Sequence, residues 1–464
     1  MALDPTSSQM SGSSDPNGSL AIHPLRPSEL DGFLESLGSA AAAFVRAQGF
    51  TAKPHTLALI PGLDGVAGAL LGLGDDRSPY AFGSVAAMLP AGHTWHLAEG
   101  SYERDDAALG IQLGRYRFGR FRSTNEPAAI IHLPGPTPRA DALAAAVCFA
   151  RDLINTPANV LGPAELADAG ADLAARFAQK SIRIVDDALT TGYPALAAVG
   201  AGSARPPAVL RFTYGDDPSH PLISLCGKGV CFDSGGYDIK PSAGMLRMKK
   251  DMGGAAIVLG VAQAIMALGI PVRLDVRIGC VENSISGHAM RPLDVIRTRS
   301  GQTIEIGNTD AEGRMVLADL LTDAADTGPD WLIDFATLTG AARVALGPDL
   351  PALFSNDDTL AQSLLDSGSR SHDPLWRLPL WAGYDQWLSS PVADSNTVGS
   401  KPMAGAIVAA LFLQRFVPPA RKWAHIDTYA WNDQTRPGRP EGGEAQALRA
   451  AVTAIESFAS DATR

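Results

Sequence analysis

The chain has 464 residues, of which 46% are hydrophobic, and a formal net charge of −11 at pH 7. This length exceeds what one ordinary hydrophobic core supports, so we expect two domains. The acidic balance makes nucleic acid an unlikely partner, and no continuous apolar run is long enough to cross a bilayer, so we expect no membrane association.

The four cysteines, Cys148, Cys226, Cys231 and Cys280, lack the paired spacing of metal ligands and have apolar neighbours. We interpret them as buried free thiols of a cytoplasmic protein. The first residues are rich in Ser, Pro, Asn and Gly and contain no hydrophobic segment typical of a signal peptide. Residues 1–20 are therefore predicted to be a disordered leader.

Residues 21–138 are predicted to form a small N-terminal α/β domain. Its expected elements are one long amphipathic helix at 26–49, strands at 56–60 and 68–72, a helix at 82–88 and strand-like pieces up to 132. This part of the chain carries no cluster of chemically active side chains. The segment 133–138, which contains Pro and Gly, is the predicted linker.

Residues 139–464 are predicted to form a larger α/β domain, in which a mostly parallel central sheet is flanked by helices. Expected strands lie at 207–214, 221–226, 272–281, 303–306, 331–337 and 422–428, and expected helices at 141–154, 253–268, 315–325 and 403–416. Ligands bind such sheets at the carboxyl ends of the strands. The segments 228–236 and 308–314 are both predicted to follow strands and so to lie at that edge.

Residues 308–314 read Asn-Thr-Asp-Ala-Glu-Gly-Arg and lie at a predicted strand-to-helix corner. Asp310 and Glu312 can point the same way from such a corner, although acidic residues at a helix start are also common caps. The segment 226–256 adds charged residues among glycines and apolar residues, where charges are costly to bury unless they are paired or bound to metal.

Four carboxylates in these two segments point to a metal centre: Asp233, Asp251, Asp310 and Glu312. Gathered without counter-charge they would repel one another, and two divalent cations would cancel the four charges. Oxygen ligands suit Mg²⁺ and Mn²⁺ and also accept Zn²⁺. Lys228 and Lys240 could form salt bridges with the acids, or Lys240 could stabilise negative charge on a substrate oxygen while Lys228 binds metal as a neutral amine.

These segments resemble the leucyl aminopeptidases, also called cytosol aminopeptidases. Residues 308–314 are identical to the signature heptad of that family, and the spacing of charged residues from Lys228 to Arg314 also matches. The resemblance implies a two-metal peptidase that removes N-terminal residues, preferably Leu or other apolar residues, from peptides with a free N-terminus. It further implies a homohexamer.

Position by position, the resemblance implies the following roles. One metal ion, Zn²⁺ or Mn²⁺ with Mg²⁺ as a further candidate, would be held by Lys228, Asp233, Asp251 and Glu312, and the second by Asp233, Asp310 and Glu312. A water or hydroxide bridging the metals would attack the peptide carbonyl, Lys240 would stabilise the oxyanion, and Arg314 would hold a bicarbonate ion as general base. The first side chain of the substrate would be bound by Met248, Thr337, Leu338 and Gly340.

Some positions depart from the family pattern, namely Cys231, 237–238, 249–250 and 425–431, but none replaces a proposed ligand. Two other function classes are weighed against the aminopeptidase. A DNA-binding or scaffolding hexamer with secondary or no peptidase activity is disfavoured by the acidic balance. A two-metal phosphohydrolase would use the same kind of carboxylate cluster to bind its metals. This alternative would require phosphate esters to be turned over.

Overall fold

The computed structural model describes residues 18–63, 65–122 and 129–462. It divides into two compact units: unit 1 comprises Met1–Ala144 with Gln434–Pro440, and unit 2 comprises Ala145–Asp433 with Glu441–Arg464. The return of residues 434–440 to unit 1 was not anticipated from the sequence. Most of the predicted leader lies outside the described residues, although its last residue, Leu20, begins the first strand. The boundary drawn at 138 stays a prediction.

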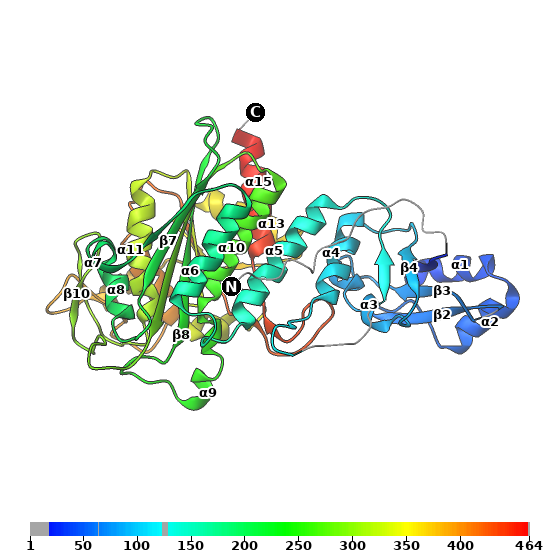
Figure 1. The fold of residues 1–464 in the computed structure, drawn as a ribbon, viewed down its shortest axis with the longest axis horizontal. Helices are drawn as coiled ribbons and strands as arrows, with labels where there is room; N and C mark the ends of the chain where they lie inside the picture. Colours follow the sequence, from blue (N-terminus) through cyan, green and yellow to red (C-terminus); the bar gives the residue numbers. More distant parts are fainter. Residues whose placement is uncertain (1–17, 64, 123–128, 463–464) are drawn as a thin grey trace. The chain divides into compact units, whose positions relative to one another are not determined.

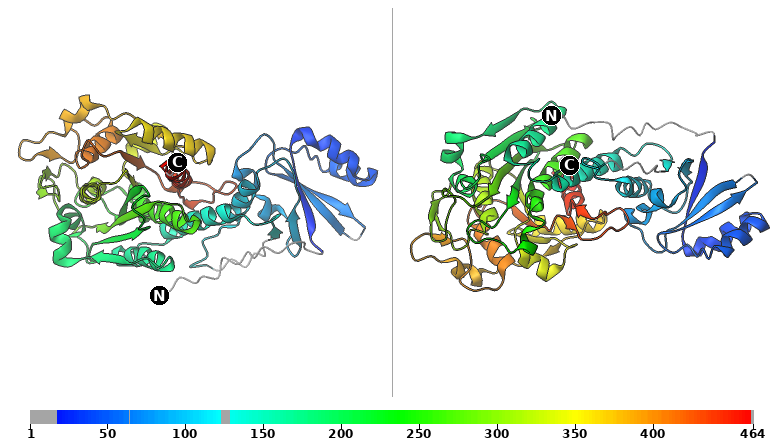
Figure 2. Two further views of the ribbon diagram at one scale, coloured as in Figure 1. Left: turned by 90° about the horizontal axis from the view of Figure 1, so that it is seen from above. Right: turned by 60° about the horizontal axis from the view of Figure 1, so that its bottom comes forward.

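Unit 1 is built on a five-stranded sheet with the order β2-β3-β1-β4-β5. The strands are β1 (Leu20–Leu25), β2 (Thr56–Gly62), β3 (Gly65–Gly72), β4 (Thr94–Leu97) and β5 (Ile130–His132). β2 is antiparallel to β3, and the other neighbours are parallel. Separate apolar clusters cover the two faces of this sheet, one of them under the blue helices α1 and α2 in Figure 2.

The helices of unit 1 correct two sequence-based predictions. They are α1 (Leu30–Ser36), α2 (Ser39–Ala47), α3 (Val85–Met88) and α4 (Arg104–Arg115), with short 3₁₀ turns at Pro27–Glu29 and Pro79–Phe82. The single helix expected at 26–49 is wrong, because Leu37 adopts an extended conformation (ψ 151°) and separates α1 from α2. Helix α4 was not predicted, because its glycines weaken the helical pattern of the sequence. Gly110 is needed at its position in α4, since a Cβ there would lie 1.8 Å from the Pro79 carbonyl oxygen.

Unit 2 is built on an eight-stranded sheet with the order β14-β13-β16-β12-β8-β9-β7-β6. The strands are β6 (Ser181–Ile184), β7 (Ala208–Tyr214), β8 (Leu222–Asp233), β9 (Arg273–Asn283), β12 (Trp331–Ala336), β13 (Ala352–Ser355), β14 (Trp376–Arg377) and β16 (Trp423–Asp427). The four central strands, β16, β12, β8 and β9, are mutually parallel. The predicted mostly parallel sheet is therefore confirmed.

Helices cover both faces of this sheet (Figure 1). On one face α10 (Gly253–Leu268) packs so closely that a Cβ at Gly227 of β8 would lie 2.7 Å from the Cα of Ala255. On the other face lies α11 (Glu312–Asp326), where a Cβ at Gly279 would meet Val316 at 2.6 Å. The remaining elements of unit 2 are α6 (Pro163–Arg176), α7 (Asp186–Gly192), α8 (Pro194–Gly200), α9 (Ser242–Met245), a 3₁₀ helix η3 (Met248–Met252), α12 (Gly340–Leu346), α13 (Asp358–Arg370), η4 (Ala382–Leu388), α14 (Gly405–Gln414), β17 (Trp431–Asn432), β18 (Gly442–Gly443) and α15 (Leu448–Ala462); α5 (Pro138–Asn155) crosses the boundary between the units.

One segment meets the length and apolar composition of a membrane-spanning helix. It comprises residues Met248–Leu268, which form η3 and α10. However, 89% of the apolar window is buried inside the structure. Its side chains are covered by the sheet and by neighbouring helices, so the segment is the core helix of unit 2.

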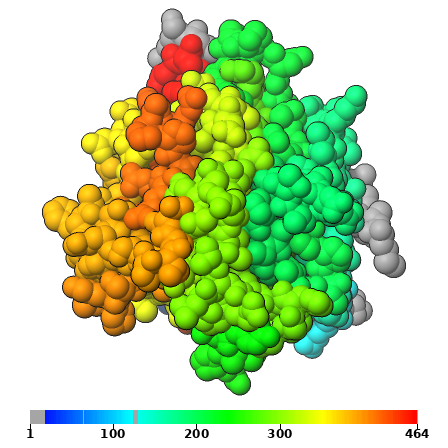
Figure 3. Space-filling model, turned by 90° about the vertical axis from the view of Figure 1, so that its left-hand side faces the viewer, coloured from blue at the N-terminus to red at the C-terminus, as the bar shows by residue number. Residues whose placement is uncertain are grey.

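Two details of the predicted sheet edge are also corrected. Lys228 does not follow a strand but lies within β8, which continues to Asp233. The heptad 308–314 follows β11 (Thr303–Glu305), which belongs to a separate three-stranded sheet with β10 (Val295–Arg297) and β15 (Ser395–Asn396). In the space-filling view of Figure 3 the orange chain around β15 lies beside the yellow-green chain that carries β10 and β11.

The four cysteines are free thiols. Cys226, Cys231 and Cys280 are buried as expected, whereas Cys148 is partly exposed. Burial raises the pKa of the Cys280 thiol to about 12, which keeps it in the unreactive protonated form at neutral pH.

Candidate metal and active site

The candidate site lies where the central strands of unit 2 end. Asp233 is the last residue of β8, Asn283 the last of β9 and Asp427 the last of β16, while Thr337 directly follows β12. Because these strands are parallel and adjacent, their carboxyl ends bring polar side chains to one edge. The loop after β11 and the start of α11 contribute the acids of the heptad.

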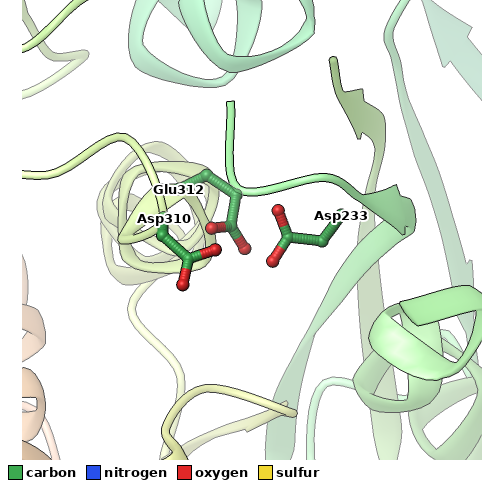
Figure 4. A group of neighbouring side chains, drawn as sticks. All are labelled: Asp233, Asp310 and Glu312. Atoms are coloured by element: carbon green, nitrogen blue, oxygen red, sulfur yellow. The ribbon is translucent and has the colours of Figure 1, made fainter. Parts of the chain in front are cut away.

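Three of the predicted ligands form a compact carboxylate cluster. One oxygen each of Asp233, Asp310 and Glu312 lies within 4.8 Å of the others, and Figure 4 shows the three carboxylates turned toward one another. Asp233 and Glu312 are buried, whereas a third of the Asp310 side chain is exposed. Burial and the nearby Asp233 raise the pKa of Asp310 to about 6 and that of Glu312 to about 8. The cluster is therefore short of positive charge.

The chemistry of this cluster fits a divalent metal ion. Oε2 of Glu312 is buried and has no hydrogen-bond partner among the residues that the structure describes. A buried carboxylate oxygen without a partner is costly, and a cation is the ligand that would satisfy it. The donor set consists of hard oxygens, which suit Mg²⁺ and Mn²⁺ and are accepted by Zn²⁺.

Lys228 and Lys240 both form ion pairs with the acids, as the salt-bridge alternative expects. Nζ of Lys228 lies 2.8 Å from Asp251 and 2.9 Å from Glu312, and it donates to the Thr337 carbonyl at 2.9 Å. Three oxygens thus surround the ammonium of Lys228. Burial favours the neutral amine, but the surrounding carboxylates outweigh burial and raise the pKa of Lys228. Metal binding by Lys228 would have to displace a proton.

Lys240 differs from Lys228 because it keeps one donor free. Its Nζ lies 2.8 Å from Asp233 and also contacts Asp310, and no third partner is found among the described residues. An ammonium has three N–H groups, so one remains for another acceptor. Its side chain is 15% exposed, which leaves the ammonium accessible from the site.

Sequence reasoning missed one supporting residue, Asn283, and gave another, Thr337, only a substrate-binding role. Asn283 donates its side-chain amide to Asp233 at 2.9 Å and to the Thr309 carbonyl at 3.0 Å, so it ties β8 to the heptad. The hydroxyl of Thr337 donates to Asp251 at 2.8 Å. The position of Asn283 at the end of a strand next to β8 was the available signal, but the register of that pairing is not visible in the sequence.

Arg314 lies in the first turn of α11 and is 8% exposed. Its Nη1 donates to the Thr397 carbonyl, its guanidinium lies 6.0 Å from the Phe412 ring, and its buried Nε has no hydrogen-bond partner within the described chain. Burial lowers the pKa of Arg314 to about 10. A guanidinium with an unused donor can bind a small planar anion.

The four residues predicted to bind the substrate side chain lie on two segments that are tied to the carboxylates. Met248 begins η3, the same short helix that carries Asp251. Thr337, Leu338 and Gly340 lie between β12 and α12. Asp427 fixes this second segment by accepting the N–H of Leu338 at 2.9 Å, and the space into which a Cβ at Gly340 would point is open.

Between these segments lies a buried cation that sequence reasoning did not select. Lys250 of η3 is 6% exposed, and its Nζ lies 4.7 Å from the centre of the Tyr429 ring. Arg343 of α12 lies 4.9 Å from the same ring. Burial lowers the pKa of Lys250 to about 8, an effect to which Lys228 and Arg343 add. A cation–π contact contributes about 0.5–2 kcal/mol. Burying an ammonium costs several kcal/mol, so the ring does not offset the burial.

Comparisons with known proteins identify relatives that span most of the chain. Residues 148–452 match the model of the cytosol aminopeptidase family, catalytic domain, and residues 20–134 match the M17 aminopeptidase N-terminal domain. A probable cytosol aminopeptidase of Syntrophotalea carbinolica is 41% identical over 75% of this chain and 73% of its own length. Another from Chlorobium limicola is 34% identical over 92% of this chain and 94% of its own length.

Solved structures are similar along nearly the whole chain. The crystal structure of the cytosol aminopeptidase from Coxiella burnetii has a TM-score of 0.93 and 44% identity, and the match covers 96% of this chain and 98% of that one. The bottromycin maturation enzyme BotP in complex with Mn has a TM-score of 0.86 and 36% identity, covering 95% and 100%. With both parts of the chain matched, the protein belongs to the cytosol aminopeptidase family, which supports aminopeptidase activity.

Proposed function

We propose that this protein is a metal-dependent aminopeptidase that removes the N-terminal residue, preferably Leu or another apolar residue, from peptides with a free N-terminus. The observation that carries the proposal is the buried carboxylate cluster with the unpartnered Glu312 oxygen, next to a lysine with a free donor. Membership of the cytosol aminopeptidase family supports it.

Two divalent ions, Zn²⁺ or Mn²⁺ with Mg²⁺ as a further candidate, would be held by Asp233, Asp310 and Glu312 together with Asp251 and Lys228. The complex of the related BotP with Mn supports a metal in this fold. When bound, the metals would supply Lewis-acid activation of water and of the peptide carbonyl. Thr337 and Asn283 keep the ligands in place through their hydrogen bonds to Asp251 and Asp233.

Two cationic side chains would act directly on the reaction. The free N–H of Lys240 would donate to the oxygen of the peptide carbonyl as negative charge develops on it. The unused Nε of Arg314 would hold a bicarbonate ion, which serves as general base for the attacking water. Arg314 is anchored for this role by the Thr397 carbonyl.

Met248, Thr337, Leu338 and Gly340 would bind the first side chain of the substrate. Met248 is a flexible apolar residue, and the open space beside Gly340 leaves room for a branched side chain. We further propose that the protein works as a homohexamer in the cytoplasm, as its resemblance to the family implies.

The test is release of leucine from Leu-p-nitroanilide and from Leu-Gly by metal-stripped protein, before and after addition of Mn²⁺ or Zn²⁺. We expect activity to return with metal and to be absent with N-acetyl-Leu-p-nitroanilide, because an acetylated terminus offers no free amine. Failure to hydrolyse either substrate with any of these metals would contradict the proposal.

A further inference from the structure

The segments that carry the proposed side-chain pocket also carry two cations. Met248 and Lys250 lie on the same 3₁₀ helix, η3, and Gly340 and Arg343 lie on the same helix, α12. Tyr429 follows Asp427 by two residues, and Asp427 holds the N–H of Leu338. The elements that carry the proposed pocket residues therefore also carry Lys250, Arg343 and Tyr429.

The two cations on the Tyr429 ring lack a directly bonded acid among the described residues. Neither Lys250 nor Arg343 has a side-chain hydrogen bond or ion pair to any residue that the structure describes; each has only the aromatic ring. The carboxylate of Asp427 is occupied by the N–H groups of Leu338 and Thr339 and by the Thr339 hydroxyl. Asp427 therefore spends its hydrogen bonds on the segment 338–339, and neither it nor Asp251, the acid next to Lys250 in the chain, forms an ion pair with Lys250 among the described residues.

The neighbouring cations provide a contrast within the same region. Lys249 donates to the Asn155 carbonyl at 2.6 Å, and Arg247 donates to the Tyr429 hydroxyl at 3.0 Å and pairs with Asp433. These two side chains have polar partners, so their positions are explained by the fold. Lys250 and Arg343 lack such partners although Lys250 is buried.

We propose that Lys250, with Arg343, binds the carboxylate of an acidic first residue of the substrate, so that the enzyme accepts N-terminal Glu or Asp in addition to apolar residues. Glutamate fits both parts of this pocket. Its methylene groups match the side formed by Met248 and Leu338, and its carboxylate would pair with the ammonium of Lys250. The inference rests on the proposed aminopeptidase function and assigns Lys250 as a specificity-determining residue of the same site.

The test compares p-nitroanilides that differ only in charge, Glu with Gln and Asp with Asn, using Leu-p-nitroanilide as the reference. In the wild-type enzyme we expect kcat/KM for the Glu compound to exceed that for the Gln compound about tenfold or more, because a buried unpaired cation rejects a neutral isostere. Lys250→Met should remove this preference, which is measured as the Glu/Gln ratio within one variant and is therefore unaffected by a general loss of activity. Lys249→Met is the matched control, because the ammonium of Lys249 already donates to the Asn155 carbonyl. This variant should leave the Glu/Gln ratio unchanged.

Arg343→Gln gives a second, independent variant, because Arg343 is exposed and its replacement does not disturb the core. It should lower the Glu/Gln ratio by a smaller factor. A wild-type enzyme that hydrolyses the Leu compound but prefers Gln to Glu, or a ratio that Lys250→Met does not change, would overturn this inference and leave the proposed function intact. Lack of activity on every anilide, with metal present, would overturn both.

A free carboxylate can also come from the end of a dipeptide. Leu-Gly and Leu-glycinamide separate this source from the side chain, since only the first has a terminal carboxylate. We expect Lys250→Met to affect the two equally. A selective loss on Leu-Gly would place the anion at the second residue and overturn the assignment to the first side chain.

Discussion

Helix α11 carries three buried acids, Glu312, Asp319 and Asp323, and their hydrogen-bond partners differ. Asp323 accepts from the Tyr193 hydroxyl at 2.8 Å and from Arg277 at 2.5 Å, and its other oxygen pairs with Arg299 at 2.8 Å. Asp319, one turn earlier, accepts three backbone N–H groups. At the start of the helix, by contrast, Glu312 has an oxygen without any partner in the described chain.

This comparison separates buried charge that stabilises a fold from buried charge that is kept for a ligand. Every oxygen of Asp319 and Asp323 is satisfied by the protein itself, so nothing further is needed there. The carboxylates around Glu312 are close together and undercompensated, which is unfavourable unless something else binds them. We therefore expect substitutions at the two ends of α11 to separate activity from stability.

The largest effect on activity is expected from Glu312→Gln, which keeps the shape of the side chain but removes its charge. Turnover of Leu-p-nitroanilide should fall by about 1000-fold or more, because a metal would lose a charged ligand. Thermal unfolding of the metal-free protein should change little or shift upward, since the substitution relieves repulsion. Asp326→Asn, at the exposed end of the same helix, is the control and should retain full turnover. If Glu312→Gln hydrolysed the substrate at the wild-type rate, the carboxylate cluster would have no role in the reaction.

Lys240→Met should have the next largest effect. Loss of a donor to a developing oxyanion lowers kcat by about 10²–10³-fold. KM should change less, because this hydrogen bond strengthens as negative charge develops on the carbonyl oxygen. The exposed Lys180→Met serves as the matched control. A change confined to KM would instead assign Lys240 to substrate binding.

Asn283→Ala should have an intermediate effect, because the side chain of Asn283 supports the site through its hydrogen bonds to Asp233 and to the Thr309 carbonyl. Loss of such a supporting hydrogen bond lowers metal affinity or activity by about 10–100-fold. Titration of the metal-stripped variant with Mn²⁺, followed by activity, measures this directly. Activity that high metal concentrations do not restore would show that Asn283 has a different role.

The sequence predicted those features whose signals are local. The helix at 253–268 was predicted with the bounds that the structure gives, because a mostly apolar run between Gly253 and Gly269 marks both ends. The strand-to-helix corner at 308–314 was also visible, since the motif is contiguous. The helix break at Leu37 was not, because the apolar spacing continues across it.

Features that depend on distant pairing could not be predicted in the same way. Asn283 reaches Asp233 only because β8 and β9 pair in a particular register, which places Asn283 opposite Asp233. Tyr429 and Lys250 are far apart in the chain and meet only after the sheet and η3 have formed. The sequence therefore indicated which acids form the candidate site, but not which neutral and cationic residues surround them.

The smallest effect on turnover is expected from Asp323→Asn. This variant tests most directly whether the satisfied and the unsatisfied buried acids of α11 have different roles. Burial alone would raise the pKa of Asp323, but Arg277 and the other donors outweigh it and hold the pKa below its usual value. A depressed pKa contributes stability that is present above the unfolded-state pKa and is lost as the pH falls through the folded-state pKa. At neutral pH the variant should lose about 3–5 kcal/mol in the free energy of unfolding, because the substitution removes one of the two carboxylates that pair with the buried Arg277. Wild-type stability should fall toward that of the variant in acid.

In urea unfolding monitored by fluorescence, Asp323→Asn should therefore show a lower midpoint, whereas Asp326→Asn should resemble the wild type. The surviving folded molecules of Asp323→Asn should turn over Leu-p-nitroanilide at the wild-type rate, because Asp323 does not contact the proposed ligands. If turnover per folded molecule fell as far as in Glu312→Gln, the two ends of α11 would form one functional unit. The distinction between satisfied and unsatisfied buried carboxylates would then lose its meaning for this protein.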